Sequence, residues 1–145
     1  MPQQRDRRGR LGAVAEPKVS WKEQPDEHDY PAAAAYLSLL ARDELVEMLV
    51  AELTKAAVRR GKAKDILRAS RLPLLPVDNK HVAADIAKVK SGKALSPVLL
   101  LRGEVRRDVA LVVADGYHRV CASYHLDENT DIPYRMASLD RDALS

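Results

Sequence analysis

In the first half of the chain, apolar residues recur at the spacing of amphipathic helices. Alanines and leucines over residues 31–40 predict a helix with Asp29 as its cap. Apolar positions over residues 46–57 follow the i, i+3, i+4 rule, and Gly61 is expected to end this helix. Acidic residues after Arg42 resemble a new helix start, so the two segments are either separate helices or one long helix.

The second half has the pattern of short strands and helices in alternation. Two unbroken apolar runs, 97–101 and 110–114, predict strands that are buried on both faces, with a charged turn over 103–108 between them. Prolines bracket residues 72–76, which predicts an edge strand or a lead-in to the sheet. The remaining elements are expected as short helices over residues 63–69, 81–90 and 118–126 and a last strand over residues 132–136.

This order of elements predicts a fold of the α/β (α+β) class, in which a small mixed sheet is flanked by helices. We expect four parts along the chain: a flexible basic leader, a helical N-terminal extension that packs on the core, the core itself, and a tail. Their predicted limits are residues 1–18, 19–71, 72–138 and 139–145. The segment around Trp21 is expected to pack across the domain, over the ligand site described below.

Composition restricts the cellular setting and the cofactors. The 145 residues include 46% hydrophobic residues and no apolar run near the roughly 20 residues of a membrane helix, so we expect a cytoplasmic protein without a membrane partner. Cys121 is the single cysteine, which excludes an internal disulfide, and a buried apolar role is expected for it. No residue pattern indicates haem, flavin, zinc or an iron–sulfur cluster.

The formal net charge of +3 is unevenly distributed and raises a nucleic-acid partner as one alternative. Arginines crowd the leader, and a second basic stretch covers residues 55–71. Aromatic residues make up only 4% of the chain, so the stacking partners that single-stranded nucleic acid uses are scarce.

The strongest chemical signal is the junction between the second apolar run and the helix that follows. The run ends in Asp115 and Gly116, and a helix begins within a few residues. A helix N-terminus exposes unpaired N–H groups, Gly116 allows close approach of a ligand, and Arg119 offers several donors to phosphate oxygens. Asp115 could place Mg²⁺ or orient a donor, and His118 could move a proton, so these two are the candidate catalytic residues. The spacing alone equally fits a simple turn, a cap and a solvated arginine.

The ordered features of residues 72–136 resemble the ParB/sulfiredoxin-like family. They comprise Leu75-Pro76-Val77-Asp78-Asn79 before a helix, a strand led by Pro97, the strand–Gly–x–x–Arg–helix corner, and a closing strand with Ile132-Pro133. The resemblance implies that the four residues from Gly116 to Arg119, Tyr117 and His118 included, contact the phosphates of a bound nucleotide. It also implies that Asn79 lies near the same pocket.

Two branches of this family narrow the expected activity. Sulfiredoxins carry a catalytic cysteine directly before the His-Arg of the corner, where this chain has Tyr117, so sulfinic acid reduction is not expected. Free-serine kinases carry Asp-Gly-His-His-Arg, which matches Asp115–Arg119 at all but one position and implies a nucleotide with Mg²⁺. Such a kinase also needs a carboxylate that accepts the substrate proton, for which Glu104, Asp78 and Asp85 are the candidates.

The leading hypothesis is therefore a domain that binds a nucleotide or another phosphorylated small molecule at Asp115–Arg119, with hydrolysis or transfer of phosphate left open. The alternatives are a nucleic-acid-binding or nuclease-like accessory protein, and a non-enzymatic interaction module with a vestigial pocket. A homodimer through the N-terminal helices is a further open alternative.

Overall fold

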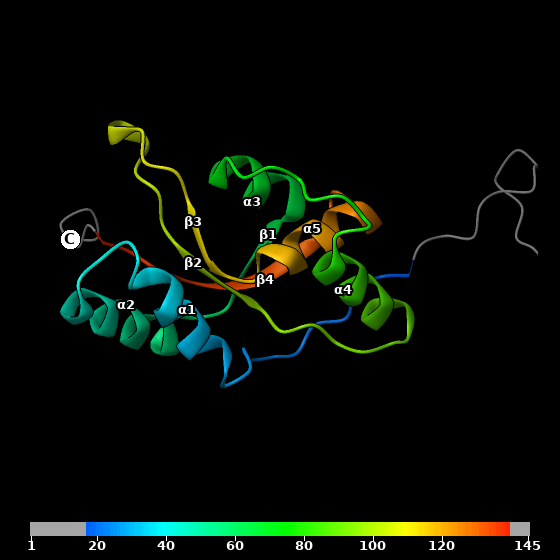
Figure 1. The fold of residues 1–145 in the computed structure, drawn as a ribbon, viewed down its shortest axis with the longest axis horizontal. Helices are drawn as coiled ribbons and strands as arrows, with labels where there is room; N and C mark the ends of the chain where they lie inside the picture. Colours follow the sequence, from blue (N-terminus) through cyan, green and yellow to red (C-terminus); the bar gives the residue numbers. More distant parts are fainter. Residues whose placement is uncertain (1–16, 140–145) are drawn as a thin grey trace, which may run out of the picture.

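The computed structural model describes residues 17–139 and contains helices on both sides of one sheet (Figure 1). None of the helices in this range is long and apolar enough to span a membrane. In chain order the elements are α1 (Asp29–Leu37), α2 (Asp43–Lys55), β1 (Arg59–Lys62), α3 (Ala63–Ser70), α4 (Lys80–Lys90), β2 (Val98–Leu101), η1 (Val105–Arg107), β3 (Val112–Asp115), α5 (Tyr117–Leu126) and β4 (Asp131–Ala137).

The four strands form a mixed sheet in the order β1-β4-β2-β3. β2 runs parallel to β4, whereas the β1–β4 and β2–β3 pairs are antiparallel. The prediction of a mixed sheet flanked by helices is confirmed at this level. The charged turn predicted between β2 and β3 carries η1, which projects away from the sheet (Figure 1).

β2 separates two apolar layers because successive side chains of a strand point to opposite faces. Leu99 and Leu101 pack with buried residues of α1 and α2. Val98 and Leu100 pack on the other face with residues of α3 and α5. All four strand residues are almost completely buried, as the unbroken apolar run predicts.

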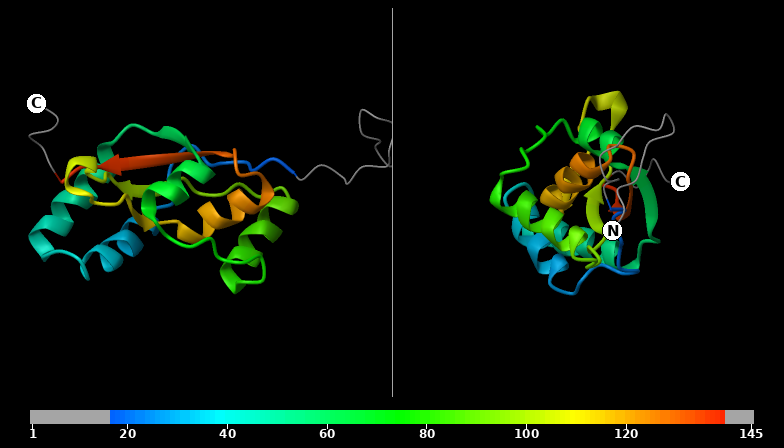
Figure 2. Two further views of the ribbon diagram at one scale, coloured as in Figure 1. Left: turned by 90° about the horizontal axis from the view of Figure 1, so that it is seen from above. Right: turned by 90° about the vertical axis from the view of Figure 1, so that its right-hand side faces the viewer.

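The helices divide into two groups, α1 with α2 and α5 with α3 and α4. Figure 2 shows these groups toward opposite ends of the sheet. α1 and α2 pack against each other, and they contact β3 and β4 respectively. α4 does not cover the sheet directly but packs along α5, where Val82 meets Cys121 and Ala122. This layering leaves the beginning of α5 between α4 and the chain segment that leads into α1.

Several predicted boundaries are corrected by the structure. The helix predicted to end at Gly61 ends at Lys55, and Gly61 instead pairs with Ile132 in the β1–β4 ladder. β1 therefore joins the segment predicted as a helical extension to the same sheet as the C-terminal strands. The break near Arg42 is confirmed, since Arg42 precedes α2 as its extended N-cap. Residues 72–76 form no strand and lead from α3 toward α4.

Replacing Leu99 by alanine tests the central position of β2. Leu99 is fully buried, so Leu99→Ala should lower the free energy of unfolding by roughly 2–5 kcal/mol, the usual cost of such a cavity. The matched control is Leu39→Ala at a side chain that is 81% exposed, with an expected change within about 0.5 kcal/mol. Urea denaturation measures both values, and equal losses would contradict the described core.

Candidate functional site

The junction between β3 and α5 has the backbone geometry of an anion-binding corner. Gly116 is the N-cap of α5 and has a φ of 108°, a conformation that side-chain-bearing residues rarely adopt. A Cβ at this position would also lie 2.5 Å from the Val98 side chain, so glycine is required on two counts. The first helical bond joins the Val120 N–H to the Gly116 carbonyl. The three preceding amides of α5 thus point out of the helix end without an intrahelical acceptor.

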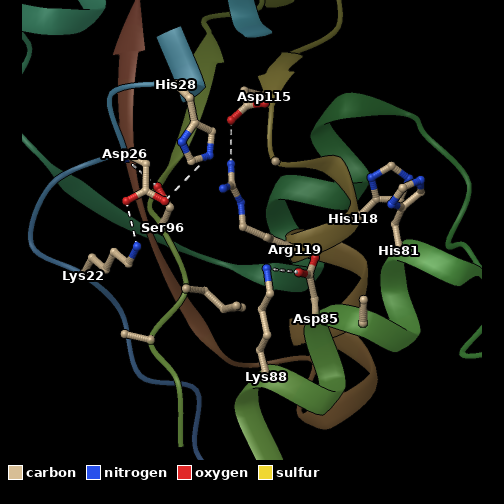
Figure 3. A pocket seen from close by; sticks show the side chains of 14 residues that line it. Lys22, Asp26, His28, His81, Asp85, Lys88, Ser96, Asp115, His118 and Arg119 are labelled. Atoms are coloured by element: carbon tan, nitrogen blue, oxygen red, sulfur yellow. Dashed lines mark hydrogen bonds and ion pairs between the residues drawn. The ribbon is translucent and has the colours of Figure 1, made fainter. Parts of the chain in front are cut away.

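A cavity of about 360 Å³ opens beside this corner. Its walls come from the start of α5, from α4, and from two segments that lie far apart in the sequence: residues 22–28 and residues 94–96 (Figure 3). Four of the predicted site residues line it, namely Asp115, Gly116, His118 and Arg119. The segment around Trp21 runs beside this site as predicted, and Trp21 bridges to Leu95.

Two predicted ligand contacts lie elsewhere. The Tyr117 hydroxyl donates a hydrogen bond to the Pro73 carbonyl at 2.5 Å, and its ring packs against buried residues behind α5. The Asn79 side chain caps α4 by accepting bonds from the amides of His81 and Val82. Neither residue lines the cavity, because each side chain is engaged in holding a helix in place.

Arg119 lies at the centre of the cavity with its guanidinium against Asp115 (Figure 3). A second carboxyl group, Asp29, engages the same guanidinium from outside the cavity lining. One Nη donates to Asp115 Oδ2 at 2.7 Å and the other lies 3.4 Å from Asp29 Oδ2. Its Nε–H is buried and has no acceptor among the described residues. Arg119 was expected to donate to phosphate oxygens, and in the structure it joins β3 and α5 to the start of α1.

The three groups of this bridge affect one another electrostatically. Burial raises the pKa of Asp115, which Arg119 lowers and the neighbouring Asp29 raises again. Asp115 thus lies beside a second carboxyl group and is engaged by Arg119. It is therefore less available to Mg²⁺ than the sequence implied.

Asp29 is the site residue that sequence reasoning missed. It was expected to cap α1, whereas it is the first residue of that helix and is 3% exposed. Its Oδ2 accepts hydrogen bonds from the Ser96 hydroxyl and, at 3.2 Å, from the Asp26 amide. Ser96 and Arg119 lie far away along the chain, so no local pattern indicates these contacts.

The rim next to Asp29 also carries groups that could hold a cation. Ligand atoms of Asp26, His28 and Asp29 lie within 4.8 Å of one another. A Lys22 Nζ–Asp26 ion pair of 2.7 Å holds the same rim from outside, and Lys22 is a main cause of the lowered pKa of Asp26. Existing hydrogen bonds and ion pairs thus already engage all three candidate ligands.

The α4 wall brings two histidines together. The rings of His81 and His118 lie 4.7 Å apart between centroids, at an angle of 45°. On the same helix, Asp85 lies 3.9 Å from Lys88, and Asp85 and Lys88 line the cavity together with His81. Burial raises the pKa of Asp85, while burial and then the neighbouring His81 lower the pKa of His118.

Of the three predicted proton acceptors, Asp85 alone lines the cavity. Glu104 lies on the exposed η1 connection, where bonds from Arg106 lower its pKa to about 2. Cys121 is buried beside α4, and burial raises the pKa of its thiol, which agrees with the apolar role predicted for it.

The basic residues of the 55–71 stretch do not all share one face. In β1 the pleat directs Arg59 to one side of the sheet and Arg60 and Lys62 to the other. In and beyond α3, Arg68 pairs with Asp65 and Arg71 pairs with Asp108.

Removing the Arg119 cation should destabilise the fold, because its two carboxyl partners then lack a counterion. Arg119→Met should lower the free energy of unfolding by roughly 2–4 kcal/mol at neutral pH, because Asp29 and Asp115 then face each other without compensation. Loss of Arg119 removes the group that lowers the pKa of Asp115, so burial and the neighbouring Asp29 should hold this pKa above its unfolded value. The deficit should therefore shrink as the pH falls toward about 4.

The matched control for this variant is Arg68→Met, which removes an exposed ion pair and should change stability by less than about 1 kcal/mol. Denaturation curves at several pH values measure both variants against the unaltered protein. A deficit that grows on acidification would contradict the proposed role of the bridge.

Comparison with known proteins assigns neither a family nor a function to this site. No protein-family model, curated protein or solved structure matches the chain. The ParB/sulfiredoxin-like resemblance therefore stays a prediction, beside an observed fold with a mixed sheet and helices on both faces. What the protein does has to be inferred from the cavity at the start of α5.

Proposed function

We propose that the cavity at the start of α5 binds a phosphorylated small molecule, nucleotides included. The observation that carries this proposal is the convergence of the open α5 N-terminus with His118 and Arg119 in one concave space of about 360 Å³. Main-chain amides and the positive end of a helix favour phosphate at such a position. The ParB/sulfiredoxin-like resemblance supports the same location independently of the cavity.

The dimensions and charges of the site favour a compact ligand. The volume lies near the lower end of the roughly 300–1,000 Å³ that small-molecule pockets occupy. Lys22 and Lys88 come from two different walls of the cavity, the N-terminal segment and α4 (Figure 3), and Asp26 and Asp85 offset part of the positive charge that they bring. A phosphate with a small organic group would fill the space, and a nucleotide would extend its base through the open side.

The same proposal extends to a nucleotide that binds with Mg²⁺ and to transfer of its phosphate. Mg²⁺ bound with a nucleotide would take the Asp26 and Asp29 carboxylates as hard oxygen ligands, and it would compete for them with Lys22 and Arg119, which engage them in this structure. Among the predicted proton acceptors, Asp85 is the one that lines this cavity, so it is the base that a transfer reaction would use. Its raised pKa places it closer to the working range of a general base.

Calorimetry tests the binding proposal with ATP, CTP and GTP, each with and without Mg²⁺. At least one of the three nucleotides should bind at a single site. His118→Gln should lower the affinity for that nucleotide roughly 10- to 100-fold, because it removes a charge-assisted hydrogen bond. The matched control is His125→Gln on the same helix, whose ring contacts the Leu75 carbonyl away from the cavity. Affinity of this control should stay within about twofold.

Two results would contradict the proposal. One is the absence of binding by all three nucleotides and by inorganic phosphate at millimolar concentration. The other is an equal loss of affinity in the His118 and His125 variants, since a site at the start of α5 should distinguish them.

A further inference from the structure

We propose that His81 and His118 together form the anion-recognising pair of this cavity, and that they select a phosphate monoester dianion over a phosphodiester. This inference rests on the proposed function and specifies its ligand class. It starts from the distribution of charge around the cavity, because most of the positive groups there already have partners.

Carboxylates hold the other basic side chains that line the cavity. Among the described residues, the ion pairs are Lys22 with Asp26, His28 with Asp29, Lys88 with Asp85, and Arg119 with Asp115 and Asp29. His81 and His118 line the same space and have no ion-pair partner in the described part of the chain. The charge available to an incoming anion thus depends on whether these two rings carry a proton.

The two imidazoles are too close to carry two charges without a counterion. Their ring centroids are 4.7 Å apart, and one comes from α4 while the other comes from the first turn of α5. Burial and then the neighbouring His81 lower the pKa of His118, and the second of these causes is the one that such a close approach predicts. Figure 3 shows both rings on the wall of the cavity opposite the Asp26 rim.

The other charged groups around the pair are engaged with one another, so the protonation of the two rings is what can vary. From α4, Asp85 raises the pKa of His118, and Lys88 pairs with Asp85. From the β3–α5 side, Arg119 lowers the pKa of His118 and is itself held by Asp115. The N-terminal segment faces the pair across the cavity with Lys22, Asp26 and His28, which form ion pairs within that segment. Tyr117 stacks behind His118 with its ring 5.8 Å away.

A monoester dianion suits such a pair better than a diester does. The dianion carries a second negative charge and three terminal oxygens, so it can accept hydrogen bonds from both rings and from an α5 amide. Its binding should draw one proton from solvent onto the pair, because the bound charge favours the imidazolium. A phosphodiester has two terminal oxygens and one charge, and therefore binds less tightly. The backbone of DNA or RNA consists of such diesters.

The test uses proton NMR of the four histidine rings with methyl phosphate and dimethyl phosphate as matched probes. Methyl phosphate should shift the His81 and His118 resonances and raise the pKa of His118 by roughly 1–2 units. His125 should not respond, since its ring lies outside the cavity. Dimethyl phosphate should bind at least about tenfold more weakly and leave the His118 titration unchanged.

Substitution of His81, the α4 member of the pair, tests whether this ring recognises the anion or only packs against His118. In free His81→Gln the pKa of His118 should rise, since a neighbouring charge that opposes its protonation is gone. The same variant should lose most of the preference for methyl phosphate over dimethyl phosphate. His125→Gln should keep both properties.

The outcomes distinguish this inference from the proposed function. Binding of methyl phosphate and dimethyl phosphate with equal affinity, or binding without a rise in the His118 pKa, would overturn the histidine pair and leave phosphate binding intact. Failure of methyl phosphate, inorganic phosphate and all nucleotides to bind would overturn both. An unchanged preference in His81→Gln would assign recognition to His118 and the helix end alone, which also contradicts the pair.

Discussion

The site depends on one guanidinium that lies between two carboxyl groups. Arg119 donates to Asp115 at the end of β3 and to Asp29 at the start of α1, and so joins parts of the chain that are 90 residues apart. Without this cation, the buried Asp29 and the partly buried Asp115 would repel each other at the point where the sheet, α1 and α5 meet. The bridge ties the N-terminal rim of the cavity to the start of α5.

The same bridge changes how the site can recognise an anion. A guanidinium that is already engaged by two carboxyl groups contributes less positive potential than a free one. Attraction then depends on the α5 main chain, whose open amides Gly116 makes accessible, and on the histidines that face it. Affinity in such a site should depend on pH more strongly than in a site built on free arginines.

Sequence patterns predicted those features that neighbouring residues determine. The unbroken apolar run of β2, the glycine turn before α5 and the break at Arg42 are local, and the structure contains all three. The strand β1 was missed because Arg59–Lys62 is polar and pairs with β4 some 70 residues later, a contact that no local signal encodes. The role of Asp29 was missed for the same reason, since a buried acid at a helix start looks like an ordinary cap until its distant partners are known.

The most direct test is a titration of the nitrogen-15-labelled protein with ATP and Mg²⁺, followed by the main-chain amide resonances. Saturable shifts should appear at the amides of Tyr117, His118 and Arg119, which form the open N-terminus of α5, and in the α4 wall of the cavity. Inorganic phosphate should compete for the same resonances. Shifts confined to β1 and α3, or none up to millimolar nucleotide, would contradict phosphate binding at the start of α5.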